Sequence, residues 1–359
     1  MMKSTAKNTI LRFVIFLCIL FLVFVYLNKV FTLPEEDENT KIFNSFYGET
    51  ENSLDGIYLG SSAVNRFWNA PLAYHEYGYS IFAFSTSSQP LVLYRNLIRE
   101  AEKTQSPKLY ILELRDVTES AENIMEEGIR RVTDNMPLFS LNRIDTINTA
   151  LDYAEQGENN VDKNRMDYYL PIIKYHGMWT QNKLSADDLL LRNTKDPSKG
   201  FLLGKKSFGQ VSQEKPLQKG ERRPLAKETE DALRKLLDYC DTLDAEVLFV
   251  LSPYSEQEEK EREWINEAVR IVEEKGYPVL NFLDEELLED LNLDWDKHYY
   301  DSKHVNILGA EVYTKYLAEY IKAHYDLADH RDDKQYKSWD EAYEYYLDFT
   351  KEKRAQMEE

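Results

Sequence analysis

Short apolar runs alternate along the chain with longer stretches of helical periodicity. Runs with the length and composition of buried strands cover residues 56–59, 81–84, 108–114, 246–251 and 278–282. Between the second and third runs, apolar residues recur at intervals of three and four from Leu91 to Ala101, which predicts a helix with one face on a sheet. Helices are also expected over 233–243 and 264–272. This alternation predicts an α/β fold with a central parallel sheet and crossover helices.

The last part of the chain predicts two further helices. Asn306 can cap a helix whose apolar stripe runs from Ala310 to Ile321. Residues 326–359 are highly charged, but their aromatic residues keep a three-four spacing, at Tyr336, Trp339, Tyr343 and Tyr346. This spacing predicts a charged amphipathic C-terminal helix. Such a helix either packs on its own domain or binds a partner, and the pattern leaves both open.

Between about residues 117 and 230 the alternation of strands and helices lapses. The segment carries helical pieces at 144–153 and 184–191, and then a stretch rich in Gly, Lys and Ser. We interpret it as a helical insertion that forms a cap or rim over the site. Positive charge gathers in its later part, at Lys195, Lys199, Lys205, Lys206, Lys215, Lys219, Arg222, Arg223 and Lys227. Such a patch could attract an anionic polymer or lipid headgroup, although a lysine-rich loop without a ligand fits the pattern as well.

The N-terminal region predicts a membrane anchor. Residues 13–27 are an uninterrupted apolar run, and the span extends over 10–33 if a few polar residues are allowed. Lys and Arg precede the span and acidic residues follow it, which places residues 1–9 in the cytoplasm and the rest outside the cell. We expect an acidic stalk over 34–50 and the main domain over 51–325. A cleaved signal peptide is the rival, but the end of the run offers no small-x-small cleavage site.

Composition excludes several classes of function. The formal net charge of -20 argues against a nucleic-acid role, because phosphate binding needs a basic face. Cys18 lies inside the apolar span, so it cannot pair with Cys240, and we expect Cys240 to be a buried inert thiol. His, Cys and carboxylates show no metal-ligand spacing, and no Gly-rich phosphate loop follows a predicted strand. We therefore expect no metal and no cofactor.

Two short blocks carry the candidate chemistry. Ser62 follows the first predicted strand on a Gly60-Ser61-Ser62 turn, and Asp301-Ser302-Lys303-His304 lies directly before the helix that Asn306 caps. A serine at such a strand end can act as a nucleophile, with His304 as general base and acid and Asp301 fixing its tautomer. Ser61 is the second choice of nucleophile. The ordinary alternatives are a capping serine, a structural histidine and a turn aspartate.

These blocks resemble those of the SGNH (GDSL-like) hydrolase superfamily, in which a Gly-Asp-Ser follows the first strand and an Asp-x-x-His precedes the last helix. The Gly-Ser-Ser turn and the Asp-Ser-x-His-x-Asn block look most like membrane-anchored bacterial members of the DltD and alginate-acetylation type. The resemblance implies a flavodoxin-like three-layer fold. It covers roughly residues 51–115 and 244–323. The Gly of the superfamily's second block would be expected near residues 85–88, and the Asn of its third block near 113–116, but neither is present.

Without that Gly and Asn, the oxyanion and substrate contacts have to come from other residues. The backbone N–H of Ser62 or Ala63 is one candidate, because both stand at the start of a helix. Ser85, Ser87 and Gln89 offer others, unless they form a polar loop that caps the next helix. Glu113 and Arg115 end the third predicted strand, where they either contact substrate or form a salt-bridged loop. Arg115 could replace the missing Asn as an electrostatic donor.

The resulting hypothesis is a membrane-anchored extracellular esterase or O-acyltransferase that works through a serine acyl-enzyme. By resemblance, its substrates are acyl esters of a cell-surface polymer, and its partner is a membrane-bound O-acyltransferase that delivers the acyl group. The alternative is a non-catalytic assembly factor or glycan-binding partner of such an acyltransferase. The missing Gly and Asn favour the alternative, and the Ser62 and Asp301-x-x-His304 blocks oppose it.

Overall fold

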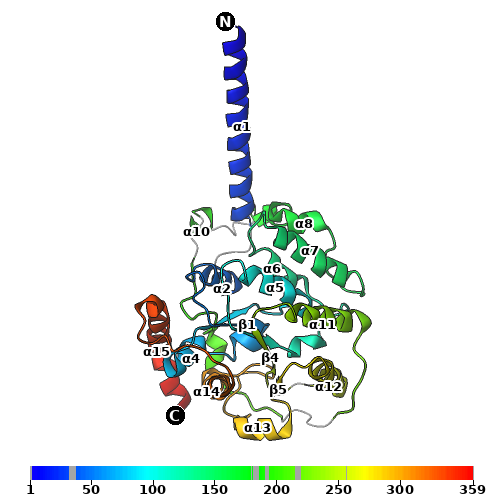
Figure 1. Cartoon of the computed structure of the whole chain (residues 1–359), viewed down its shortest axis with the longest axis vertical. Helices are drawn as coiled ribbons and strands as arrows, with labels where there is room; N and C mark the ends of the chain where they lie inside the picture. The colour runs from blue at the N-terminus through cyan, green and yellow to red at the C-terminus, as the bar shows by residue number, and fades with distance from the viewer. Residues whose placement is uncertain are drawn as a thin grey trace.

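A parallel β-sheet lies at the centre of the molecule (Figure 1). The computed structural model describes residues 2–31, 38–178, 180, 186–190, 194–214, 220–255 and 257–358. Within these residues five strands are ordered β2-β1-β3-β4-β5, and each neighbouring pair is parallel. The strands are β1 (Gly56–Gly60), β2 (Ile81–Ser85), β3 (Leu109–Glu113), β4 (Glu246–Leu251) and β5 (Val279–Asn281). The predicted α/β fold with a parallel sheet is confirmed, and the strand order is that of flavodoxin-like sheets.

Helices cover both faces of the sheet. The connection from β1 to β2 runs one way along the sheet and the later ones run the other way, so right-handed crossovers place their helices on opposite faces. In agreement, α14 packs on α4, whereas α11 packs on α5 and α12 (Figure 1). The helices of these layers are α3 (Ser62–Asn65), α4 (Ala70–Tyr77), α5 (Tyr94–Ala101), α11 (Lys227–Cys240), α12 (Glu259–Glu274), α13 (Glu285–Leu291) and α14 (Ile307–His324).

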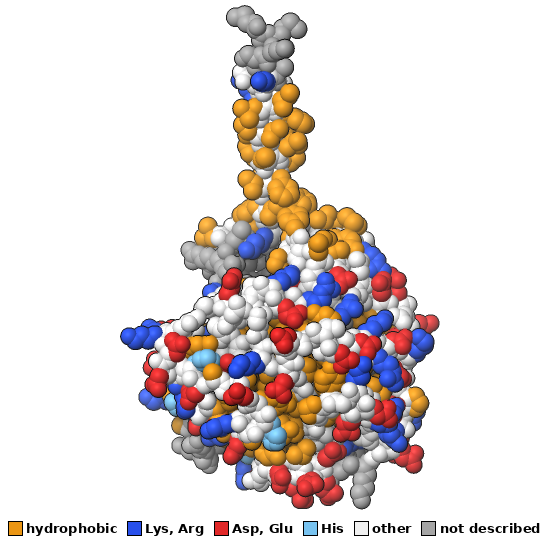
Figure 2. All heavy atoms as spheres, viewed as in Figure 1, with side chains coloured by type: hydrophobic (Ala, Val, Ile, Leu, Met, Phe, Trp, Pro, Cys, Tyr) orange, Lys and Arg blue, Asp and Glu red, His pale blue; other side chains and the backbone are white. Residues whose placement is uncertain are grey.

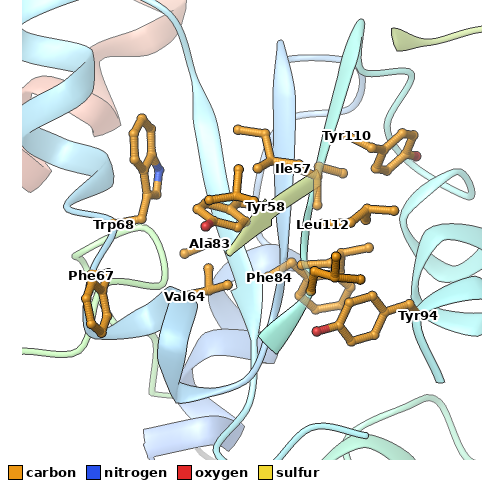
Figure 3. Close-up of a cluster of buried hydrophobic side chains, with 14 of the residues drawn as sticks. Ile57, Tyr58, Val64, Phe67, Trp68, Ala83, Phe84, Tyr94, Tyr110 and Leu112 are labelled. Carbon is orange, nitrogen blue, oxygen red and sulfur yellow. The ribbon is translucent and has the colours of Figure 1, made fainter. Parts of the chain in front are cut away.

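Burial on both faces explains why the strands read as continuous apolar runs. Successive side chains of a strand point to opposite faces. In Figure 3, Tyr58 lies on the same side as Val64 and Trp68, whereas the preceding Ile57 lies with Leu112 on the other side. All five side chains are fully buried. The core therefore occupies both interfaces between the sheet and its helices.

The acidic stalk predicted over 34–50 is wrong where the structure describes it. Residues 38–46 form α2 (Glu38–Phe46), and Ile42, Phe43 and Phe46 are buried in the main core. The ring of Phe46 stacks on that of Phe84 at 4.0 Å. The apolar residues fall on one helix face, so their burial outweighs the acidic character of the flanking residues. The packed unit therefore begins at α2 and not at residue 51, while residues 34–37 lie outside the described residues.

The insertion has two structurally different parts. Its helices are α6 (Glu126–Thr133), α7 (Leu141–Ala154), α8 (Arg165–Tyr169), α9 (Pro171–Tyr175) and α10 (Ala186–Leu189). α7 packs against α5 and α8, and α9 packs against the N-terminal helix. The later segment borders α3 and the loop before α14, because Leu202 N–H donates to Asn65 O at 2.8 Å and Val211 N–H to Tyr299 O at 3.1 Å. The later segment therefore lies beside the elements that carry Ser62 and His304, and its role as a rim over the site stays a prediction.

The basic residues of the insertion do not form one free patch. Lys199 is buried, and its Nζ lies 2.8 Å from a carboxylate oxygen of Glu49. Arg223 pairs with Glu263 at 2.5 Å. The charge of Lys199 is compensated in the interior and that of Arg223 by an ion pair at the surface, so neither is a free charge of the predicted patch. Lys215 and Lys219 lie outside the described residues.

Both helices predicted near the C-terminus are present. The Oδ1 of Asn306 accepts the backbone N–H groups of Leu308 and Gly309 and so caps α14. The last helix, α15 (Lys337–Glu358), packs against α4 and buries Trp339 and Tyr346 in the core. The C-terminal helix therefore packs on its own domain, which was one of the two alternatives that the sequence left open.

The N-terminal helix α1 (Met2–Val30) stands away from the rest of the molecule (Figure 1). Its segment Lys7–Val30 is long and apolar enough to cross a membrane. At its carboxyl end, Asn28, Val30 and Phe31 are buried against the domain. Cys18 is exposed on this helix, whereas Cys240 is buried as expected.

Candidate active site

The candidate nucleophile lies on a tight turn at the carboxyl end of β1. Gly60 ends the strand, Ser61 caps α3, and Ser62 is the first residue of that helix. A Cβ at Gly60 would lie 2.6 Å from the Cβ of Glu113, so glycine is needed for this close approach of β1 and β3. Asp116 fixes the turn, because its Oδ2 accepts the backbone N–H of Ser61 at 2.9 Å.

Ser62, His304 and Asp301 form a chain of hydrogen bonds. The Oγ of Ser62 lies 2.7 Å from the Nε2 of His304, and the Nδ1 of His304 lies 3.0 Å from each carboxylate oxygen of Asp301. A carboxylate on Nδ1 fixes the tautomer in which Nε2 can accept the proton of the serine hydroxyl. Ser62 and His304 are 242 positions apart in sequence, so it is the fold that brings them together. Their catalytic roles stay a prediction.

The surroundings of the triad keep the imidazole neutral and the carboxylate ionised. Burial lowers the pKa of His304, and the positive charges of Arg115 and Arg66 lower it further, against the raising effect of the bond to Asp301. Burial also opposes ionisation of Asp301. The hydrogen bonds that it accepts from the His304 ring and from the N–H groups of Lys303 and His304 outweigh burial, and its pKa is lowered. A neutral imidazole that faces a hydroxyl is what general-base catalysis requires.

The loop that carries His304 is held at both ends and from beneath. Tyr299 and Val305 form an antiparallel bridge that closes the loop. Arg115 Nη1 donates to the carbonyl of Lys303 at 3.1 Å. The guanidinium of Arg115 lies over the ring of Tyr254, 4.6 Å from its centroid, which fixes the orientation of the arginine. Arg115 is therefore both a support of the loop and a positive charge beside His304.

Two backbone N–H groups beside the nucleophile are free of strong hydrogen bonds. Ala63 N–H reaches the Oγ of Ser61 at only 3.4 Å. In the described part of the chain, no acceptor contacts the N–H of Ser62. Groups in this position can donate to an oxyanion that forms on the atom attacked by Ser62. One helical turn on, the buried amide of Asn65 has no hydrogen-bond partner among the described residues for either its oxygen or its nitrogen, and the sequence did not identify this residue.

Ser85 and Gln89 lie close to the site but beneath its surface. The register of β1 and β2 pairs Ser85 with Gly60, directly before the turn that carries Ser62. Both side chains are fully buried, and Gln89 accepts a hydrogen bond from the hydroxyl of Thr86 at 3.2 Å. This burial argues against direct substrate contact, because substrate would have to enter the packed interior to reach these two side chains, and their predicted role stays a prediction.

Ser87 is half-buried, and its main chain is engaged on both sides. Its N–H donates to the Oδ1 of Asn39 at 2.8 Å, and its carbonyl accepts a hydrogen bond from Arg131 at 3.0 Å. The next residue, Ser88, has a φ of 56°, in the left-handed region that favours glycine. The superfamily's second-block Gly was expected within residues 85–88, and the backbone here has a conformation typical of glycine.

Glu113 is part of the interior and does not face substrate. Its side chain is fully buried, and its Oε1 accepts the N–H groups of Arg115 and Ser252 at 3.1 Å each. Its Oε2 accepts the hydroxyl of Tyr58 at 3.3 Å. Burial is the main reason that the pKa of Glu113 rises to about 7. These contacts argue against the predicted substrate contact, which stays a prediction, since this carboxyl group ties the end of β3 to β1 and β4.

Two neighbours of His304 were missed at the level of sequence. The ring of Tyr300 stacks on that of His304, with centroids 5.7 Å apart and an interplanar angle of 12°. Arg66 contributes positive charge to the site, and its Nη1 donates to Leu202 O at 3.0 Å. The spacing of four from Ser62 to Arg66 was a signal, because such residues share a helix face. The stacking of Tyr300 depends on how the loop closes, and it left no local signal.

No protein-family model matches the chain, and no curated protein was found to be similar to it. The chemistry of the site therefore has to be argued from its geometry. That geometry is a half-buried serine at the end of a strand, a neutral histidine on its hydroxyl and an ionised aspartate on the far ring nitrogen. Beside the serine, the N–H of Ala63 makes only a long hydrogen bond to Ser61, and the N–H of Ser62 has no acceptor among the described residues.

Proposed function

We propose that the protein is a serine esterase or O-acyltransferase of SGNH type. The observation that carries the proposal is the 2.7 Å contact between Ser62 Oγ and His304 Nε2, with Asp301 on the opposite ring nitrogen. The lowered pKa of His304 supports it further, because the base has to be neutral before reaction.

The reaction proceeds in two half-reactions. Ser62 Oγ attacks the carbonyl carbon of an acyl ester while His304 Nε2 takes the hydroxyl proton. The tetrahedral intermediate then expels the alcohol, to which His304 returns that proton, and the acyl group stays on Ser62 as an ester. In the second half, water or a sugar hydroxyl attacks this ester, with His304 again moving the proton. Water gives a carboxylic acid, and a sugar hydroxyl gives a new O-acyl ester.

The oxyanion of each tetrahedral intermediate needs donors that are already in place. The N–H group of Ser61 already donates to Asp116, so it is not a candidate. The N–H groups of Ser62 and Ala63 are suitable, because neither makes a short hydrogen bond. Arg115 lies close enough to lower the pKa of His304, so its charge also favours a negative charge at the serine. No cofactor or metal takes part in this proposal.

The substrate and location follow from the resemblance and from α1. Anchoring through Lys7–Val30 would put the domain at the outer face of the cell membrane, with the N-terminus in the cytoplasm. An acylated cell-surface polymer is then the substrate or acceptor, and a membrane-bound O-acyltransferase is the partner that supplies the acyl group.

One observation favours the alternative of a non-catalytic assembly or glycan-binding factor. The blocks that usually supply side-chain oxyanion donors here contain Ser85, Gln89 and Glu113, which are all buried. A factor of this kind would bind its acyltransferase partner or a glycan without forming an acyl-enzyme. It would therefore be indifferent to the loss of the Ser62 hydroxyl.

The test is ester turnover by full-length protein in detergent, using p-nitrophenyl acetate. We expect Ser62→Ala and His304→Ala each to lower kcat/KM by about 10³-fold or more. Ser120→Ala and His324→Ala are matched controls, since both residues lie outside the site, and they should retain wild-type turnover. Wild-type activity in folded Ser62→Ala protein would exclude the serine mechanism and leave the non-catalytic alternative.

A further inference from the structure

Exposed apolar side chains gather where α1 leaves the domain (Figure 2). They belong to the loop before α7, to α7, α8 and α9, and to the residue that follows α10, and Figure 1 places α7, α8 and α10 beside the base of α1. We name this set the apolar collar. Its members are Phe139, Leu141, Ile144, Met166, Ile173 and Leu190.

The collar is tied to α1 by direct contacts. The rings of Phe21 and Phe139 stack with centroids 5.6 Å apart. The hydroxyl of Tyr26 donates to the carbonyl of Leu189 at 2.7 Å. Asn28 is fully buried, and its Oδ1 accepts the backbone N–H of Ile172 at 3.3 Å. The helix therefore leaves the domain in a fixed direction, so a membrane that holds α1 also fixes the position of the collar.

The length of α1 sets the depth of the collar. The span Lys7–Val30 has 24 residues and is about 36 Å long at the α-helical rise. Phe21 lies about 21 Å along it from Lys7. A hydrocarbon layer of about 30 Å that fits within this span places Phe21 about 9 Å or more below its outer boundary. Phe139 stacks on Phe21, so it lies inside the outer leaflet as well.

Exposure of the collar side chains to water would be unfavourable if no lipid covered them. Leu141 is 82% exposed and Phe139 is 57% exposed, although both are large apolar side chains. Large contiguous apolar patches on a protein surface mark interaction sites. The collar is continuous with the apolar surface of α1 itself, and this continuity indicates that the same bilayer covers both (Figure 2).

We propose that the apolar collar is inserted in the outer leaflet of the membrane and acts as a second anchor that fixes the domain's orientation on the bilayer. The bound partner is lipid. This inference rests on the proposed insertion of α1 but not on the chemistry of Ser62. The domain is thereby held against the membrane instead of swinging on the end of a single helix.

The test uses nitroxide labels on full-length protein in nanodiscs of equal parts phosphatidylcholine and phosphatidylglycerol. Native Cys18, exposed on α1, reports whether α1 is inserted, while buried Cys240 stays unlabelled. In a Cys18→Ala background, Leu141→Cys and Phe139→Cys report on the collar. Val211→Cys is the matched control, because Val211 is a 46% exposed apolar residue outside the collar. Power saturation measures access to oxygen, which enters lipid, and to a nickel chelate, which stays in water.

We expect labels at 141 and 139 to lose nickel access by about tenfold or more relative to the label at 211, as the label at Cys18 does. If the collar labels are as accessible to nickel as the control label while the label at Cys18 is shielded, insertion of the collar is disproved and insertion of α1 stands. A nickel-accessible Cys18 would overturn both. Collar labels shielded in native membranes but open to nickel in nanodiscs would mean that a protein, and not lipid, covers this surface.

Discussion

At the scale of single residues, the charge state of His304 depends on the cations around it. Arg115 and Arg66 both lower its pKa, and burial lowers it most. We therefore expect the acidic limb of the kcat/KM profile to lie below the usual histidine value of 6.5. Activity is lost as the pH falls through this limb, because protonated His304 cannot accept the proton of Ser62.

Arg115→Gln removes a positive charge that disfavours the protonated imidazole. The pKa of His304 should rise, so the acidic limb should move to higher pH. Arg115→Lys keeps the charge and should leave the limb near its wild-type position. The check is a pH profile of ester hydrolysis for the three proteins, and a limb in Arg115→Gln that stays fixed or moves to lower pH would contradict this account.

Burial raises the pKa of Glu113 from 4.5 to about 7, so we expect the stability of the fold to depend on pH through this residue. The folded state holds a proton that the unfolded chain releases at lower pH. The stabilisation that protonated Glu113 gives to the folded state is therefore complete below a pH of about 4.5, and it is lost as the pH rises through about 7. Glu113→Gln can keep the acceptor for the N–H groups of Arg115 and Ser252 without this loss.

We expect Glu113→Gln to be more stable than wild type by about 3 kcal/mol at a pH of about 8, and close to wild type at a pH of about 5. Urea denaturation at both values measures the difference. Glu289→Gln, an exposed site on α13, is the control and should show no such dependence. A variant less stable than wild type at the higher pH would mean that the ionised carboxylate is required.

At the scale of elements, Asn306 joins the start of α14 to the loop that carries His304. Its Oδ1 caps the helix, and its Nδ2 donates to the carbonyls of Gly209 at 3.0 Å and Lys297 at 2.6 Å. It is also only two residues from His304. Loss of this amide removes a helix cap and leaves two carbonyl groups without their donor.

Asn306→Ala should lower the free energy of unfolding by about 3 kcal/mol, of which a cap accounts for about 1. Asn306→Asp keeps the acceptor for Leu308 and Gly309 but not the donations, so we expect an intermediate loss. Thermal and urea denaturation measure both, and kcat should fall with them as the loop loosens. Equal stability of wild type and Asn306→Ala would disprove this role.

The strands and the last helices were predictable because each carries its own local signal. A parallel strand buried on both faces is an apolar run, as at residues 246–251, and Asn306 is a recognisable cap. α2 was not predicted, because its three apolar residues are few and acidic residues surround them. Only the tertiary contact with Phe84 shows that they belong to the core.

The candidate site was predictable to the same extent. Ser62, Asp301 and His304 stand in short blocks that can be read without the fold, but the roles of Glu113 and Arg115 depend on where neighbouring strands end. Glu113 reads as a surface charge in sequence, and the register of β3 and β4 buries it. The stacking of Tyr300 on His304 likewise exists only after the loop has closed.

At the scale of the whole molecule, the turn that carries Ser62 is tied through α2 to the end of α1. The chain from Val30 to Glu38 reaches at most about 28 Å when fully extended. Glu38 pairs with Arg66 at 3.0 Å, and Arg66 is one helical turn from Ser62. The proposed enzyme would therefore act on esters held near the membrane surface.

The predicted topology can be tested on intact protoplasts. The protein should stay in the membrane fraction after high-salt washing, and external protease should digest the domain. A tag at the N-terminus should be protected from that protease, because the cations before the span keep this end inside. Protection of the domain would reverse the orientation, and a mature N-terminus beyond residue 27 would mean that the span is cleaved.

The central claim is a covalent acyl-enzyme at Ser62, and intact mass measurement after treatment with a fluorophosphonate tests it most directly. This reagent reacts with a serine that a neighbouring base activates. We predict one adduct per chain, located at Ser62 by peptide mapping, absent in Ser62→Ala and strongly slowed in His304→Ala. Folded wild-type protein that gains no adduct, or that gains it at a serine other than Ser62, would contradict the account.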